Sequence, residues 1–106
     1  MTASYLVVYE GEPDDPDEFY DYYVNTHLPL VWGFPEIRRI EIMRGVDNPG
    51  IFMITRLVFD DVHDLRRAVT SPHRQVTKTD MANFPRFRGE VRWVIVDDHH
   101  FDNPAG

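Results

Sequence analysis

A single histidine stands where the chain can place a proton-transferring group inside a pocket. His27 lies within Phe19–Arg39, FYDYYVNTHLPLVWGFPEIRR, a stretch that reads as a helix, a proline-containing exit and the start of a strand. At about 100° per residue, His27 falls near the middle of an apolar arc roughly 140° wide. A histidine on the core-facing side of a helix is either a packed structural residue or the working group of a pocket. The arc comprises Phe19, Tyr20, Tyr23, Val24, His27, Leu30, Val31 and Phe34.

The chemistry open to such a histidine is proton transfer. An imidazole with a pKa of about 6.5 gains or loses a proton near neutral pH. Burial beside aromatic side chains disfavours its charged form and keeps it a base. Tyrosine hydroxyls can orient the ring or bind an enolate oxygen. We therefore predict a small-molecule pocket with His27 as general acid or base and with Tyr20, Tyr23 and Phe34 in its wall.

Other polar groups give weaker signals for a site. Each strand arginine can hold a substrate carboxylate, but pairing across strands with Glu41 or Glu90 is the simpler expectation. Adjacent histidines in the tail segment DDHHFD point in opposite directions, so nothing fixes a metal geometry. The chain has no cysteine, no glycine-rich phosphate loop and no H-E-x-x-H motif. We expect no metal, haem, nucleotide or other cofactor. The strand arginines are Arg38, Arg39, Arg56 and Arg92.

Length and charge restrict the class of protein. The 106 residues suit one domain, expected over residues 1–98 with a short tail over residues 99–106. A net charge of −7 argues against a nucleic-acid partner, which requires a basic surface. The first residues, MTASYLVVYEG, lack a basic leader and a long apolar run. We therefore expect neither a signal peptide nor a membrane span, and a cytoplasmic location.

The elements that position His27 follow the order βαββαβ. Apolar and β-branched runs predict strands, and capping and proline signals predict two helical regions. Asp15 is the expected cap of the first helix, and Pro29 should kink or end it because proline has no amide hydrogen. Asp60 or Asp61 should cap the second helical region, which should break and restart at Ser71–Pro72 and whose apolar stripe comprises Val62, Leu65, Val69, Val76 and Phe84. The expected strands are Ser4–Tyr9, Ile37–Arg44, Ile51–Phe59 and Arg88–Val96, and the first helix is Pro16–His27.

This order predicts an α+β fold of the ferredoxin-like kind, a four-stranded antiparallel sheet with the helices on one face. The strands nevertheless carry apolar residues on both faces, most clearly in Ile51–Phe59 and Arg88–Val96. Strands buried on one side alternate, and these largely do not. The helices cover one face only, so a second copy of the chain is the simplest cover for the other. We predict a homodimer formed through the sheet face away from the helices.

The segment around His27 resembles the signature of EthD-like proteins in the dimeric α+β barrel superfamily. In that family a Y-x-x-x-H-x-P-L-V segment closes the first helix, and a proline-led turn, usually Pro-Gly, opens the second strand. Glu36 stands where the glycine usually stands. Thr79–Phe84 also resembles the D-x-x-N-F ending of the family's second helical region. The matching residues are Tyr23, His27, Pro29, Leu30, Val31 and Pro35.

The resemblance implies a dimeric α+β barrel with a substrate cleft between helices and sheet. Related barrels include lactone isomerases, polyketide cyclases and dehydratases, and cofactor-free monooxygenases. Two hypotheses follow. The first is a cofactor-independent enzyme of catabolic or polyketide-type metabolism that uses His27 as general acid or base. An isomerase, cyclase or dehydratase is the first choice, and an oxidoreductase is the second. The second is a non-catalytic ligand-binding or accessory dimer associated with an oxidoreductase system.

Overall fold

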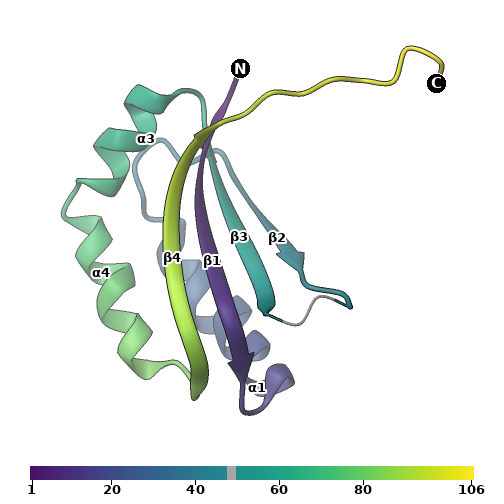
Figure 1. The fold of residues 1–106 in the computed structure, drawn as a ribbon. Helices are drawn as coiled ribbons and strands as arrows, with labels where there is room; N and C mark the ends of the chain where they lie inside the picture. Colours follow the sequence, from purple (N-terminus) through teal and green to yellow (C-terminus); the bar gives the residue numbers. More distant parts are fainter. Residues whose placement is uncertain (48–49) are drawn as a thin grey trace.

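Four antiparallel strands form one sheet in the order β2-β3-β1-β4, and the helices pack on one of its faces (Figure 1). This computed structural model describes residues 1–47 and 50–106. The strands are β1 (Ala3–Pro13), β2 (Arg39–Arg44), β3 (Ile51–Phe59) and β4 (Phe87–Asp97). The helical segments are α1 (Pro16–Tyr22), η1 (Tyr23–His27), α2 (Leu28–Val31), α3 (Val62–Val69), α4 (His73–Asp80) and η2 (Met81–Asn83). The predicted ferredoxin-like α+β fold is confirmed.

The central strand β1 extends four residues beyond the predicted end at Tyr9, because β4 pairs with it as far as Pro13↔Phe87. Gly11 and Gly89 face each other in this added part, with φ of 128° and 152°. A Cβ on Gly11 would lie 2.1 Å from the carbonyl oxygen of Arg88. The two backbones come this close only because both residues lack a side chain.

The sheet face toward the helices carries the core. On β1, Tyr5, Val7 and Tyr9 are buried, and they lie beside Leu57, Thr55 and Met53 of β3 in the register. The helices contribute Phe19 and Tyr23 from the first helical region and Leu65, Ala68 and Val69 from α3. Tyr9 makes edge-to-face contacts with Phe19 and Tyr23 at 5.9 and 5.5 Å. Aromatic packing of this kind fixes the first helix against the sheet.

The opposite face of the sheet carries no helix of the described residues, and it combines apolar side chains with Arg56 and Arg92, which lie beside Leu6 and Val8 in the register. Leu6 and Val8 of β1 alternate with the buried tyrosines, and they lie beside Val94 of β4 and Ile54 of β3. Val94 remains 44% exposed. We call Leu6, Val8, Ile54 and Val94 the outer apolar face. The predicted two-sided apolar character of the strands is therefore present in the structure.

The first helical region does not end at His27 as predicted but continues through Pro29 to Val31. It begins as predicted, because Asp15 accepts a hydrogen bond from the Glu18 amide at 3.1 Å and Pro16 takes the first turn. Tyr23–His27 then forms a π-helical segment, in which the Leu28 N–H bonds to the carbonyl of Tyr23. This wider turn lies directly before Pro29, so the chain absorbs the missing amide hydrogen without leaving the helix.

The second helical region corrects one predicted core position. Asp61 caps α3, and Leu65 and Val69 are buried as expected. Val76, however, is 46% exposed, and the prediction that it continues the apolar stripe is wrong. The chain breaks at Thr70–Pro72 and restarts at His73, which shifts the helical phase. Thr77 and Asp80 face inward instead.

The turn before β2 bears on the family resemblance. Glu36, where the family usually has glycine, adopts φ of 66°, the left-handed conformation that glycine reaches most easily.

Asp98 is fixed to the sheet, since it accepts hydrogen bonds from Thr2 and Ser4 and pairs with Arg56 at 2.7 Å. Residues 99–106 are exposed and run away from the sheet (Figure 1). The domain boundary at residue 98 stays a prediction.

Among the described residues, no helix combines the length and apolarity that crossing a membrane requires.

Candidate functional site

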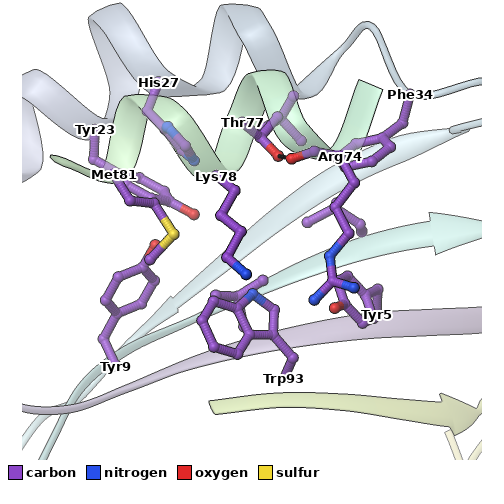
Figure 2. A pocket seen from close by; sticks show the side chains of 13 residues that line it. Tyr5, Tyr9, Tyr23, His27, Phe34, Arg74, Thr77, Lys78, Met81 and Trp93 are labelled. Atoms are coloured by element: carbon purple, nitrogen blue, oxygen red, sulfur yellow. Dashed lines mark hydrogen bonds between the residues drawn. The ribbon is translucent and has the colours of Figure 1, made fainter. Parts of the chain in front are cut away.

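A pocket lies between the helices and the inner face of the sheet, and its wall combines aromatic, aliphatic and charged side chains (Figure 2). Its space is ≈ 490 Å³ counted out to the open mouth. The sheet supplies Tyr5, Tyr9 and Trp93, the first helical region supplies Tyr23 and His27, and α4 supplies Arg74, Thr77 and Lys78. Phe34 follows α2 and closes one end. Val7, Val31, Leu57 and Met81 complete the lining.

His27 is held in this pocket by a carboxylate. It is 5% exposed, and its Nδ1 lies 2.9 Å from Oδ2 of Asp80 on α4. The imidazole also packs edge-on against Phe84 at 4.7 Å and beside Tyr23 at 5.2 Å. The ring is therefore fixed in position by one hydrogen bond and two aromatic neighbours.

Asp80 is the centre of a small hydrogen-bond network. Tyr22 donates its hydroxyl hydrogen to Oδ1 of Asp80 at 2.7 Å, and the Asn83 amide donates to the same oxygen at 3.2 Å. Burial on its own raises the pKa of the Asp80 carboxyl, but the hydrogen bonds from Tyr22, His27 and Asn83 outweigh it and hold this pKa below 3.8. Asp80 is thus a carboxylate at neutral pH, and it faces His27 as an acceptor.

The accepting carboxylate decides which nitrogen of His27 carries the hydrogen. In the neutral ring, Nδ1–H donates to Asp80, so the lone pair is on Nε2. Nε2 has no partner among the described residues, and in them every fully buried side-chain nitrogen and oxygen is hydrogen-bonded. Nε2 therefore touches the open space of the pocket. Burial lowers the pKa of His27 below 6.5, and the Asp80 interaction opposes this shift only in part.

The four residues predicted for the site separate into three inside the pocket and one outside it. Tyr23, His27 and Phe34 line the pocket, and the Tyr23 hydroxyl shares a 2.7 Å hydrogen bond with Thr55. Tyr20 is not in the lining. Its ring lies under the guanidinium of Arg44, whose Cζ is 4.3 Å from the ring centroid. The prediction for Tyr20 assumed about 100° per residue throughout the helix. This angle does not hold across the π-helical segment that follows Tyr20.

Sequence reasoning missed the residues that the sheet and α4 bring to the site. Asp80, Arg74, Lys78, Tyr9 and Trp93 were not predicted as site residues. Asp80 and Asn83 were present in the D-x-x-N-F match, but the match alone did not pair them with His27. A second signal was available, because an aspartate on the inner face of a helix requires a buried partner.

The strand arginines and the tail histidines lie outside the pocket. Arg56 pairs with Asp98, Arg38 with Asp60, and Arg92 with Glu10 at 3.3 Å. Among the described residues, no three His, Cys, Asp or Glu side chains gather as metal ligands would. Neither group of residues contributes to the site around His27.

Comparison with known families identifies the chain. Residues 12–87 match the EthD domain, a region that includes both His27 and Asp80. The chain belongs to the EthD family. The predicted family is thus confirmed, and the match covers most of this EthD protein.

Solved structures share the fold of this EthD protein. An ethyl tert-butyl ether d (EthD) family protein from Bacillus halodurans aligns with a TM-score of 0.76 at 24% identity, over 93% of this chain and 100% of that one. SnoaB, a cofactor-independent oxygenase from Streptomyces nogalater, aligns with a TM-score of 0.62 at 14% identity, over 94% of this chain and 94% of that one. A dimeric protein of unknown function and ferredoxin-like fold from Bacteroides fragilis gives 0.60 at 17% identity, over 92% and 96%. No curated protein matches the sequence significantly.

Proposed function

We propose that this EthD protein is a cofactor-independent enzyme acting on a small molecule, with His27 as its general base and acid. The observation that carries the proposal is the His27–Asp80 pair, which turns the Nε2 lone pair of a desolvated imidazole into an aromatic pocket. A packed structural histidine gains nothing from an unpaired nitrogen that opens onto a cavity. The likeness to SnoaB, described as a cofactor-independent oxygenase, is compatible with chemistry of this class.

In this proposal Nε2 of His27 takes a proton from a carbon or hydroxyl of the bound substrate. The imidazolium that forms is stabilised by the adjacent Asp80 carboxylate, whose charge is maintained by Tyr22 and Asn83. Returning the proton at another position completes an isomerisation, a cyclisation or a dehydration. If dioxygen attacks the carbanion or enolate, the same first step begins an oxygenation. The aromatic wall excludes water from the proton being transferred.

The second candidate is a ligand-binding or accessory dimer without catalysis. The observation in its favour is the small space inside the pocket, since only ≈ 40 Å³ admits the centre of a water molecule. A protein of this kind would bind its ligand equally well with His27 charged or neutral, and it would show no turnover.

The pH dependence of turnover tests the enzyme proposal. With a substrate found in a panel of lactones, polyketide intermediates and quinols, kcat/KM should fall as pH falls through the pKa of His27. Because burial lowers this pKa, the midpoint of the acid limb should lie below 6.5. A rate that instead rises with pH until near 10 would contradict the proposal and indicate a tyrosine base. Absence of turnover with bound substrates would favour the non-catalytic dimer.

We also propose that a second copy covers the outer apolar face. Apolar residues of this face lie on β1, β3 and β4, and charged side chains that form ion pairs, such as Arg92 with Glu10, lie on the same face. Apolar surface in contact with water costs about 25 cal/mol per Å², so self-association of this face stabilises the fold. The likeness to a protein described as dimeric with a ferredoxin-like fold supports the same arrangement.

Light scattering tests this dimer. The wild-type protein should give twice the 12.5 kDa chain mass at micromolar concentration. Val94→Glu places a charge in the outer apolar face and should shift the mass toward that of the monomer. Val76→Glu is the matched control, because Val76 on α4 is 46% exposed, close to the 44% of Val94, but lies among the helices. A monomeric wild type, or equal effects of the two variants, would contradict the proposal.

A further inference from the structure

Two positive side chains at the pocket have no carboxylate beside them. Arg74 and Lys78 lie four residues apart on α4, and both line the pocket. In the part of the chain that the structure describes, neither forms an ion pair, whereas arginines elsewhere do, such as Arg56 with Asp98 and Arg88 with Asp14. Two cations without a carboxylate partner therefore lie at one cavity, in a chain of net charge −7 with eighteen acidic residues.

Both side chains reach toward the aromatic wall rather than away from it. In Figure 2 the Lys78 amine lies above the Trp93 ring, and the Arg74 guanidinium lies beside Tyr5. Burial raises the pKa of the Tyr5 hydroxyl, and the positive charge of Arg74 partly opposes that shift. Both side chains are exposed, so their charges lie at the mouth of the pocket, where an aromatic ring and an anion can be bound together.

We propose that the pocket binds a planar aromatic carboxylate, with its carboxylate at Arg74 and Lys78 and its ring against Trp93 and Tyr5. The proposal deepens the proposed function and uses its pocket, but binding does not depend on His27 being a base. Asp80, which holds His27, is on the same helix as both cations. Arg74 and Asp80 are six positions apart, about 9 Å along a helix axis. When the carboxylate of the ligand is held near Arg74, the far end of its aromatic part thus lies beside His27. This distance suits a ligand with a single ring or two fused rings.

The pocket admits such a ligand only when side chains of α4 move, because only ≈ 40 Å³ of its present space admits the centre of a water molecule. Lys78 and Met81 reach into this space in Figure 2. Both side chains are unbranched and flexible, so a ring can enter by displacing them without a change in the backbone.

Binding of a matched pair of probes tests the inference. We expect 2-naphthoate to bind wild-type protein at least about tenfold more tightly than the neutral 2-naphthalenemethanol, measured by calorimetry. The preference should weaken with added salt. Arg74→Gln and Lys78→Gln should each reduce it, and the double variant should abolish it. Arg66→Gln is the control, because Arg66 on α3 also has no carboxylate partner among the described residues but does not line the pocket.

The outcomes separate this inference from the catalytic proposal. Equal affinity for the two probes, no binding of either at millimolar concentration, or a preference that survives the double variant would each overturn it. A loss of preference in Arg66→Gln as large as in Lys78→Gln would overturn it as well. Charge-selective binding without turnover would therefore leave the inference standing while the enzyme proposal fails.

Discussion

Replacing His27 with glutamine should lower turnover by about 10²- to 10⁴-fold, the usual contribution of a positioned acid or base. Glutamine is polar, and its amide can donate to Asp80 as Nδ1 of His27 does at 2.9 Å. The partner of a buried carboxylate is thereby kept, so the dimer and most of the folding free energy should remain. What glutamine lacks is a basic nitrogen facing the pocket. Single-turnover rates and thermal unfolding of the same sample would measure both effects.

His73→Gln is the matched control for this prediction. His73 is a half-buried histidine of the helical layer, and its Nε2 lies 2.6 Å from the Leu30 carbonyl, to which it can donate. It packs against Phe34 but does not line the pocket. Its replacement should change stability without a specific loss of turnover. If His27 is only structural, His27→Gln should instead cost about 1–3 kcal/mol of stability, and the folded protein should keep wild-type turnover.

The part of the site predicted from the sequence is the part encoded by local helical geometry. The apolar arc placed His27, Tyr23 and Phe34 on the buried side, and the Asp15 cap fixed where the helix begins. Tyr20 was predicted in the pocket wall but lies outside the lining, because the π-helical segment after Tyr22 changes the angle per residue between Tyr20 and His27. Nothing in the composition of Tyr23–His27 indicates that wider turn. Pro29 predicted a kink or an end of the helix. The helix continues instead, because the Leu28 N–H bonds to the carbonyl of Tyr23 directly before the proline.

The residues that sequence reasoning could not place come from elements distant along the chain. Asp80 lies 53 residues after His27, and their pairing depends on how α4 restarts after Pro72. The break before this restart was predicted at Ser71–Pro72, but the apolar stripe was expected to continue across it to Val76, which is exposed. Trp93 faces the pocket because β4 pairs with β1 in the register Val7↔Trp93. Strand parity was visible in the sequence, but which parity faces the helices was not.

Asp80→Asn should abolish most of the acid–base function of His27, although it replaces only one heavy atom of the Asp80 side chain. Tyr22 and Asn83 both donate to Oδ1, so that position must stay an oxygen in the variant. The new amide nitrogen then replaces Oδ2 and faces Nδ1 of His27 as a donor. Nδ1 must accept, and the hydrogen of the neutral ring moves to Nε2. The pocket now meets an N–H in place of a lone pair.

We therefore expect Asp80→Asn to lower kcat by about 10²- to 10⁴-fold with little change in the binding of 2-naphthoate, because the wrong tautomer removes the base and leaves the pocket intact. Nitrogen-15 NMR of the imidazole should show protonated Nδ1 in the wild type and protonated Nε2 in the variant. Asn83→Ala is the control, since it removes one donor to Oδ1 of Asp80 without contacting His27. A wild-type tautomer in a poorly active Asp80→Asn protein would mean that the carboxylate acts through its charge alone. Full activity with the inverted tautomer would show that Nε2 of His27 is not the base.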